Sequence, residues 1–137
     1  MTGQRQFHPK GTHVLADLYG ASPLLLADAA FLKGAASEAA ERAGATLLAV
    51  HCHPFGPGQG VAGVVLLAES HLTFHTWPEH GFAALDAFMC GDCEPVLAIE
   101  YLNQALQAQS RVLRVMERGA DSASGPAQEN TSASVSA

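Results

Sequence analysis

Short apolar segments separated by turns constrain the fold of this chain more than any other feature. Several such segments follow one another between Thr46 and Met89, and the longest break among them is the Gly/Pro-rich loop Pro54–Gly60. Parallel strands need a crossover of a dozen or more residues, so links this short favour antiparallel pairing. The centre of the chain is therefore predicted to form an antiparallel sheet.

The flanking segments supply helices and one further strand. His13–Tyr19 alternates apolar and polar residues as a strand does. Ser22 and Pro23 offer an N-cap followed by proline at the first helical position. Helical spacing then continues to Gly44, which stands where a left-handed cap residue is expected. Pro95–Gln109 predicts a second helix of similar kind.

The central strands are expected at Thr46–His53, Val61–Glu69 and Leu72–Trp77, with Gly81–Met89 either continuing the last of these or starting a new strand. Arg111–Arg118 is a charged segment suited to the edge of a sheet. If Gly81–Met89 continues the strand that starts at Leu72, the order of elements is β-α-β-β-β-α-β. Two helices on one face of a mainly antiparallel sheet predict an α+β two-layer sandwich.

The ends of the chain and its charge bound the class of protein. Gly119–Ala137 has a single large apolar side chain, so we expect a disordered Ser/Ala-rich tail after a domain spanning residues 1–118. The net charge of −6 argues against a nucleic-acid partner. No apolar run approaches the ~20 residues that cross a bilayer, so no membrane partner is expected. An odd number of cysteines and a polar N-terminal segment predict a reducing, cytoplasmic location.

Reactive side chains concentrate in the central part of the chain, which holds all three cysteines and most of the histidines. One interpretation is a metal site. His51 and His53 point to the same face of a strand, and Cys90 and Cys93 form a C-x-x-C pair, so the four would suit tetrahedral zinc. The spacing matches no standard zinc finger, and a structural role for each residue remains the alternative.

A second interpretation is covalent chemistry. Ser70 follows Glu69 at the end of a predicted strand, His75 comes five residues later, and Cys90 ends the next apolar segment. A hydroxyl, an imidazole and a thiol at the ends of neighbouring strands would give an activated nucleophile with a base and an acid. Spacing alone does not choose between hydrolase, transferase and lyase.

The segment Ala68–Asp92, AESHLTFHTWPEHGFAALDAFMCGD, narrows this choice. With its ESHL run at Glu69–Leu72, its HTWPE run at His75–Glu79 and its Cys90-Gly91 pair, it closely resembles the bacterial and archaeal S-adenosylmethionine decarboxylases. These are pyruvoyl-dependent lyases of spermidine and polyamine biosynthesis, made as zymogens. The likeness extends over about residues 11–119. It implies a homodimer of processed chain pairs, with S-adenosylmethionine as substrate.

The resemblance also implies roles for single residues. The proenzyme would cleave its own Glu69–Ser70 bond autocatalytically and convert Ser70 into a pyruvoyl group. This group, the cofactor, would form a Schiff base with the substrate amine. His75 would be the proton acceptor in processing, and Cys90 would be the catalytic proton donor. No metal is expected.

Two substrate contacts and one departure follow from the same resemblance. Glu79 would accept hydrogen bonds from the ribose, and Phe55 would stack on the adenine. The family usually has a serine, thought to assist processing, where this chain has Ala62. The alternatives are an arginine or ornithine decarboxylase with the same pyruvoyl chemistry, and an unprocessed, non-enzymatic homologue that binds zinc.

Overall fold

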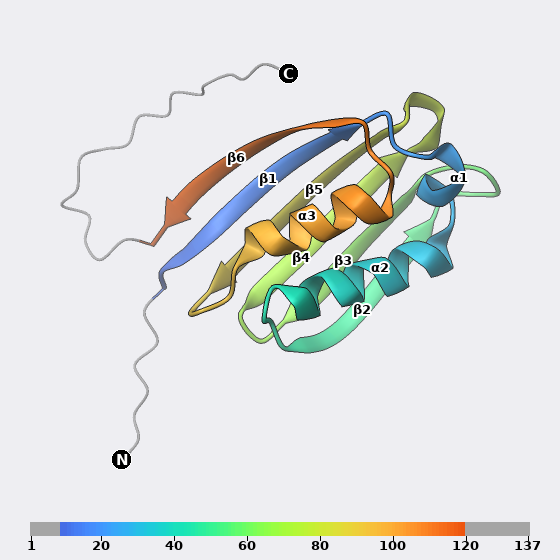
Figure 1. Cartoon of the computed structure of the whole chain (residues 1–137). Coiled ribbons are helices and arrows are strands. Elements are labelled where there is room, and N and C mark those ends of the chain that lie inside the picture. The colour runs from blue at the N-terminus through green and yellow to red at the C-terminus, as the bar shows by residue number, and fades with distance from the viewer. Residues whose placement is uncertain (1–8, 120–137) are drawn as a thin grey trace, which may run out of the picture.

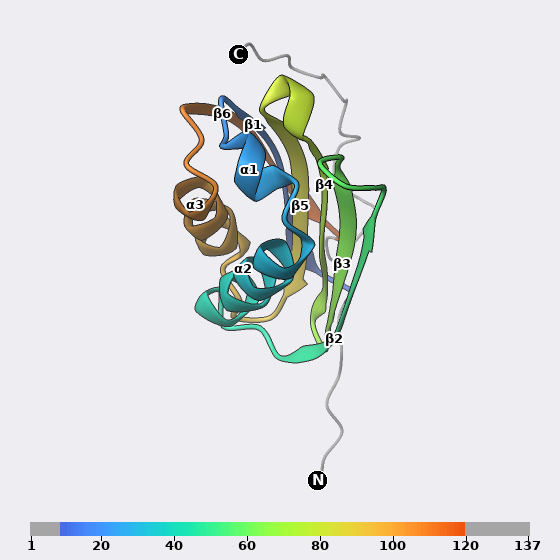
Figure 2. The same cartoon turned by 90° about the vertical axis from the view of Figure 1, so that its right-hand side faces the viewer.

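The computed structural model describes residues 9–119, in which one sheet carries helices on a single face (Figures 1 and 2). The six strands are β1 (Gly11–Tyr19), β2 (Leu47–Pro54), β3 (Val61–Leu67), β4 (Ser70–Trp77), β5 (Phe82–Cys90) and β6 (Ser110–Arg118). Their spatial order is β2-β3-β4-β5-β1-β6, and every neighbouring pair is antiparallel. The predicted α+β two-layer architecture is confirmed. The predicted tail lies, apart from its first residue, outside the described residues.

The third central strand of the prediction is in fact two strands. Pro78, which has no N–H to give a sheet, starts the short 3-10 helix η1 (Pro78–His80) at the end of β4. Gly81 follows with a φ of 60° and donates its N–H to the Pro78 carbonyl. The chain then reverses, so that Phe82 pairs with Trp77. The predicted order β-α-β-β-β-α-β was therefore one strand short, whereas the expected edge position of Arg111–Arg118 is confirmed by β6.

The first predicted helix is divided into α1 (Pro23–Leu26) and α2 (Ala29–Arg42), and the second is α3 (Pro95–Ala105). The division falls at Asp28, whose carboxylate accepts a hydrogen bond from the Phe31 N–H at 2.9 Å and so caps a new helix. Gly44 follows α2 with a φ of 86°, as a left-handed cap residue does. No helix in residues 9–119 has the length and hydropathy that a membrane span needs.

The core lies between the sheet and the helices. The small alanines of α2 let this helix approach the strands closely, and Gly63 leaves room for the Phe74 ring, which an added Cβ would meet at 2.2 Å. The buried Thr76 hydroxyl accepts from the Val61 N–H and donates to the Leu26 carbonyl, which ties α1 to the sheet. The largest fully buried apolar side chains are Leu18, Leu26, Leu72, Met89, Ile99, Leu102 and Leu106.

The other face of the sheet carries none of the described helices (Figure 2). Because successive strand residues point to opposite faces, this open face takes the residues of β4 and β5 that alternate with buried ones. Its β4 members are His71, Thr73, His75 and Trp77. Most of the reactive side chains named by the sequence therefore lie on one uncovered surface.

Candidate active site

The Glu69–Ser70 peptide bond lies in a tight turn between two central strands. Leu67 and Ser70 are the last pair of the β3–β4 ladder, so only Ala68 and Glu69 connect the strands. Ser70 has a φ of 145°, a region of backbone space in which side-chain-bearing residues are rare. Such a conformation costs about 1–3 kcal/mol and is characteristic of functional sites.

Hydrogen bonds hold both the backbone carbonyl and the side chain of Glu69. Its carbonyl oxygen accepts a hydrogen bond from the Cys90 N–H at 3.2 Å. Its carboxylate accepts from the Thr46 N–H at 2.8 Å and from the Thr46 hydroxyl at 3.0 Å. The hydrogen bond from the Thr46 backbone is the main reason that the pKa of the Glu69 carboxyl is lowered. A backbone N–H directed at this carbonyl can stabilise negative charge that develops on the oxygen.

Ser70 and Cys90 lie at the same end of the sheet, since Ser70 pairs with Met89 across β4 and β5. The structure thus brings together two of the three residues that the sequence predicted to converge. His75 is not with them. It lies five residues along the extended strand β4, which places it about 17 Å from Ser70 in the same chain. Extension of the strand separates residues that their spacing alone made look close.

His75 lies in an aromatic stack at the far end of the open face. Its ring is nearly parallel to the rings of Trp77 and Phe55, with centroid distances of 4.3 Å and 5.5 Å. Phe55 comes from the loop after β2 and is half exposed. Ala62 on β3 is the direct strand partner of His75. A serine at position 62, which the resemblance implies is usual, would therefore place a hydroxyl beside this imidazole.

Glu79 follows the stack in η1 and is exposed to solvent. Beside it, a hollow of about 320 Å³ is lined by Tyr19, Trp77, His80 and Phe82. The far end of β4 thus offers aromatic surfaces and a carboxylate, whereas the near end offers a hydroxyl, a thiol and a strained peptide bond. The first set suits binding of a nucleoside, and the second suits covalent chemistry.

A cluster that the sequence analysis did not predict lies next to Ser70. His13, His71 and Asp86 place their polar atoms within 4.8 Å of one another on β1, β4 and β5. The signal was present in the alternation of strand residues: His71, Thr73 and His75 share a face, and Asp86 pairs with Thr73. It required the strand register, which the sequence analysis did not assign.

The four residues of the predicted zinc site are not brought together. His51 and His53 lie on β2, three strands from Cys90 on β5, a separation of about 14 Å at the usual strand spacing. The Cys93 thiol donates to the Gly44 carbonyl, and burial is the main cause of its raised pKa.

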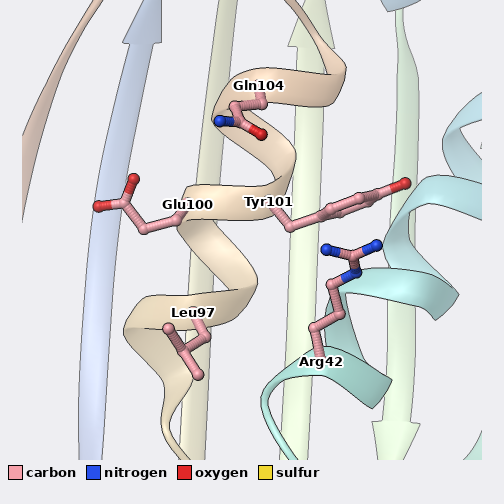
Figure 3. A pocket seen from close by; sticks show the side chains of 5 residues that line it. All are labelled: Arg42, Leu97, Glu100, Tyr101 and Gln104. Atoms are coloured by element: carbon pink, nitrogen blue, oxygen red, sulfur yellow. The ribbon is translucent and has the colours of Figure 1, made fainter.

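A second hollow lies on the helical side of the molecule. It has a volume of about 430 Å³ and is lined by Arg42 of α2 and by Leu97, Glu100, Tyr101 and Gln104 of α3 (Figure 3). The Arg42 guanidinium lies 4.6 Å from the centre of the Tyr101 ring. The sheet separates this hollow from Ser70 and Cys90, so it does not belong to the candidate active site.

Comparison with known proteins agrees with this geometry. Residues 12–119 match the S-adenosylmethionine decarboxylase family. The chain is 50% identical to the S-adenosylmethionine decarboxylase proenzyme of Parasynechococcus marenigrum, over 79% of this chain and 84% of that protein. It is 44% identical to the proenzyme of Thermodesulfovibrio yellowstonii, over 80% and 81% of the two chains.

A solved structure is also similar. The crystal structure of the adenosylmethionine decarboxylase from Aquifex aeolicus superposes with a TM-score of 0.76 at 36% sequence identity, over 85% of this chain and 97% of that one. This chain belongs to the S-adenosylmethionine decarboxylase family, whose members are made as proenzymes.

Proposed function

We propose that the chain cleaves itself between Glu69 and Ser70 and then decarboxylates S-adenosylmethionine. The observation that carries the proposal is the turn itself. It places a serine with a φ of 145° directly after a carbonyl that accepts a hydrogen bond from the Cys90 N–H. Attack of a serine hydroxyl on the preceding carbonyl closes a five-membered ring, so the covalent structure already holds the reacting atoms close. Breaking the peptide bond also releases the backbone strain.

The residues around the turn fit a pyruvoyl group made from Ser70. When formed, this group supplies an electron sink for decarboxylation. The Cys90 side chain lies at the same end of the open face and can return a proton to the substrate carbon. The decarboxylated product would serve as an aminopropyl donor in polyamine synthesis.

We infer that two copies complete each site. His75, Glu79 and Phe55 lie at the far end of β4 from Ser70, so one chain does not present all of these residues to one substrate. The open face also exposes apolar side chains, with Leu66 and Met116 each 50% exposed. Two open faces packed in antiparallel fashion about a twofold axis would bring the Ser70 end of one copy to the His75 end of the other. Such pairing would bury this apolar surface in both copies.

The test is the intact mass of freshly purified protein under denaturing conditions. We expect two fragments, residues 1–69 and residues 70–137, the second with a blocked N-terminus. Ser70→Ala has no hydroxyl to attack the carbonyl and should remain one chain. Cleavage of Ser70→Ala at the same bond would contradict the mechanism.

Substrate choice is tested separately with the processed protein. Release of CO₂ from carboxyl-labelled S-adenosylmethionine, arginine and ornithine should be rapid only for the first. The aromatic surfaces of Phe55 and Trp77 suit an adenine ring, which neither amino acid provides. Faster release from arginine or ornithine would favour the amino-acid decarboxylase alternative.

A further inference from the structure

A line of polar contacts leads from the Ser70 hydroxyl through His71 to the partly buried carboxylate of Asp86. The Ser70 Oγ lies 3.1 Å from the His71 Nδ1, and the His71 Nε2 lies 3.4 Å from the Asp86 Oδ2. Strand pairing produces this arrangement, because Asp86 lies diagonally across the β4–β5 ladder from His71. A hydroxyl, an imidazole and a carboxylate in this order form the arrangement that activates a serine nucleophile.

The neighbours of Asp86 determine the direction of these hydrogen bonds. An arginine side chain can only donate, so Arg118 Nη1 donates to the His13 Nδ1 at 3.0 Å. The proton of His13 is then on Nε2, which donates to the Asp86 Oδ2 at 2.7 Å. The Thr73 hydroxyl donates to the other carboxylate oxygen. Asp86 is thus held by two strands besides its own.

The same logic assigns the proton of His71. The His71 Nε2 lies 3.4 Å from the Asp86 Oδ2, and a carboxylate only accepts, so this contact favours the tautomer that carries its proton on Nε2. The Nδ1 atom then has a free lone pair, and it faces the Ser70 hydroxyl. Phe88 packs against both imidazoles, with ring centroids 5.9 Å from His71 and 5.0 Å from His13, and limits their rotation. His71 is therefore oriented to accept a proton from Ser70.

We propose that His71, oriented by Asp86, is the general base that activates Ser70 for self-cleavage. The inference rests on the proposed cleavage at Glu69–Ser70. The Ser70 hydroxyl proton moves to His71 Nδ1 as Oγ bonds to the Glu69 carbonyl carbon, and the carbonyl electron pair moves onto the oxygen that faces the Cys90 N–H. The carbon–nitrogen bond then breaks, and His71 returns the proton to the Ser70 nitrogen, which leaves an ester and a free amine.

This role is separate from that of His75. The resemblance assigns His75 to removal of the Ser70 Cα proton, which belongs to the later elimination step. His71 acts before that step and within its own chain, because it adjoins Ser70 in sequence. Asp86 is a positioning residue, since it contacts His71 and not the reacting atoms.

The same three side chains could instead hold a cation, because two imidazoles and a carboxylate are common metal ligands. The hydrogen bonds favour the base. The His13 Nε2 donates to Asp86, the His71 Nε2 faces the same carboxylate, and the Arg118 Nη1 lies 3.0 Å from the His13 Nδ1. A cation would have to displace these protons and lie near a fixed positive charge.

The experiment follows the full chain as it is made in a cell-free translation system and measures the rate at which the Glu69–Ser70 bond becomes sensitive to denaturing hydroxylamine, which cuts the ester but not a peptide bond. His71→Ala should slow this rate by about 10²–10⁴-fold, the usual contribution of a general base. His71→Gln keeps an N–H that can donate to Asp86 but has no basic nitrogen, so its rate should be as low as that of His71→Ala. It also serves as the test if His71→Ala folds poorly. Imidazole added to His71→Ala should restore part of the rate.

Asp86→Asn should slow cleavage at least tenfold, and the double variant Asp86→Asn/His71→Ala should be no slower than His71→Ala alone, because Asp86 acts only through His71. If Asp86 had a purely structural role, the rate of the double variant would instead be reduced by the product of the two single reductions. The matched control is His51→Ala, an exposed histidine on β2 with no contact to Ser70 or Asp86, which should cleave at the wild-type rate.

The outcomes separate the two proposals. If the wild-type chain is not cleaved, the proposed function fails and the inference fails with it. If wild-type is cleaved and His71→Gln keeps pace with it, only the role of His71 is overturned. If cleavage stops when a chelator is added and resumes when zinc is added, these residues hold a metal ion, and the role of His71 as a base is overturned.

Discussion

The two ends of strand β4 differ in the kind of interaction they make. At Ser70 the contacts are polar and directional, and the peptide bond before it is fixed by hydrogen bonds from Thr46 and Cys90. At His75 the contacts are nearly parallel aromatic rings, those of Trp77 and Phe55. One end is built to hold a reacting bond in place, and the other offers flat surfaces to a ligand.

This difference has a consequence for assembly. A strand of eight residues is rigid, so its ends cannot approach each other within one chain. Under the proposed function, chemistry that uses both ends would need a second copy of the sheet. The open face supplies the surface for this, while the helices confine the hydrophobic core to the other side (Figure 2).

The largest expected effect comes from placing one substitution at each end of β4, in two different copies of the chain. Ser70→Ala lacks the proposed nucleophile and His75→Ala lacks the proposed proton acceptor, so each variant alone should make almost no pyruvoyl enzyme. When the two are co-expressed, a mixed dimer contains one site with both residues intact. With random pairing, about a quarter of all sites should recover. Activity and fragment formation in the co-purified mixture measure this recovery.

Ser70→Ala co-expressed with Cys90→Ala provides the matched control. Ser70 and Cys90 lie at the same end of the sheet, so no mixed dimer site contains both, and this pair should not recover decarboxylation. Recovery by this pair, or none by the first, would contradict the assignment of the two ends to different copies.

A second variant separates cleavage from turnover at the Ser70 end. Cys90→Ala removes the thiol but keeps the backbone N–H that contacts the Glu69 carbonyl. Fragment formation should therefore persist, whereas decarboxylation should fall by about 10²–10⁴-fold through loss of the proton donor. Intact mass and CO₂ release from the same sample distinguish the two steps. Near-normal turnover by the processed variant would remove Cys90 from the role of acid.

Much of this arrangement could be predicted from the sequence, and the rest required the register of the strands. The antiparallel centre, both main helices and the edge strand followed from turn residues and alternation. The hairpin at Pro78–Gly81 was left open because the tight 3-10 turn is too short to interrupt the apolar pattern clearly. The sequence does not give distances along and across strands, so it grouped His75 with Ser70. It gave no role to Asp86, which lies closer to Ser70 than His75 does.

The aromatic end should affect substrate binding more than chemistry. Phe55→Ala removes a half-exposed ring that stacks on His75 and is available to an adenine. Stacking of a base on an aromatic side chain contributes about 1–3 kcal/mol, so KM should rise roughly tenfold or more while cleavage continues. Leu24→Ala, an exposed apolar residue on the helical side, is the control and should leave KM unchanged. A loss of kcat at constant KM would place Phe55 outside the binding surface.

The smallest expected effect concerns Ala62, which lies directly opposite His75 on β3. Restoring the family's serine should add one hydrogen-bonding hydroxyl beside the imidazole without disturbing the core, because residue 62 is on the open face. A single hydrogen bond contributes about 0.5–1.5 kcal/mol, so Ala62→Ser should speed fragment formation about two- to tenfold. Ala84→Ser, on the other side of the same imidazole, is the matched control. An equal gain from both variants would show that any nearby hydroxyl suffices, and no gain from Ala62→Ser would show that the wild-type His75 end already works without one.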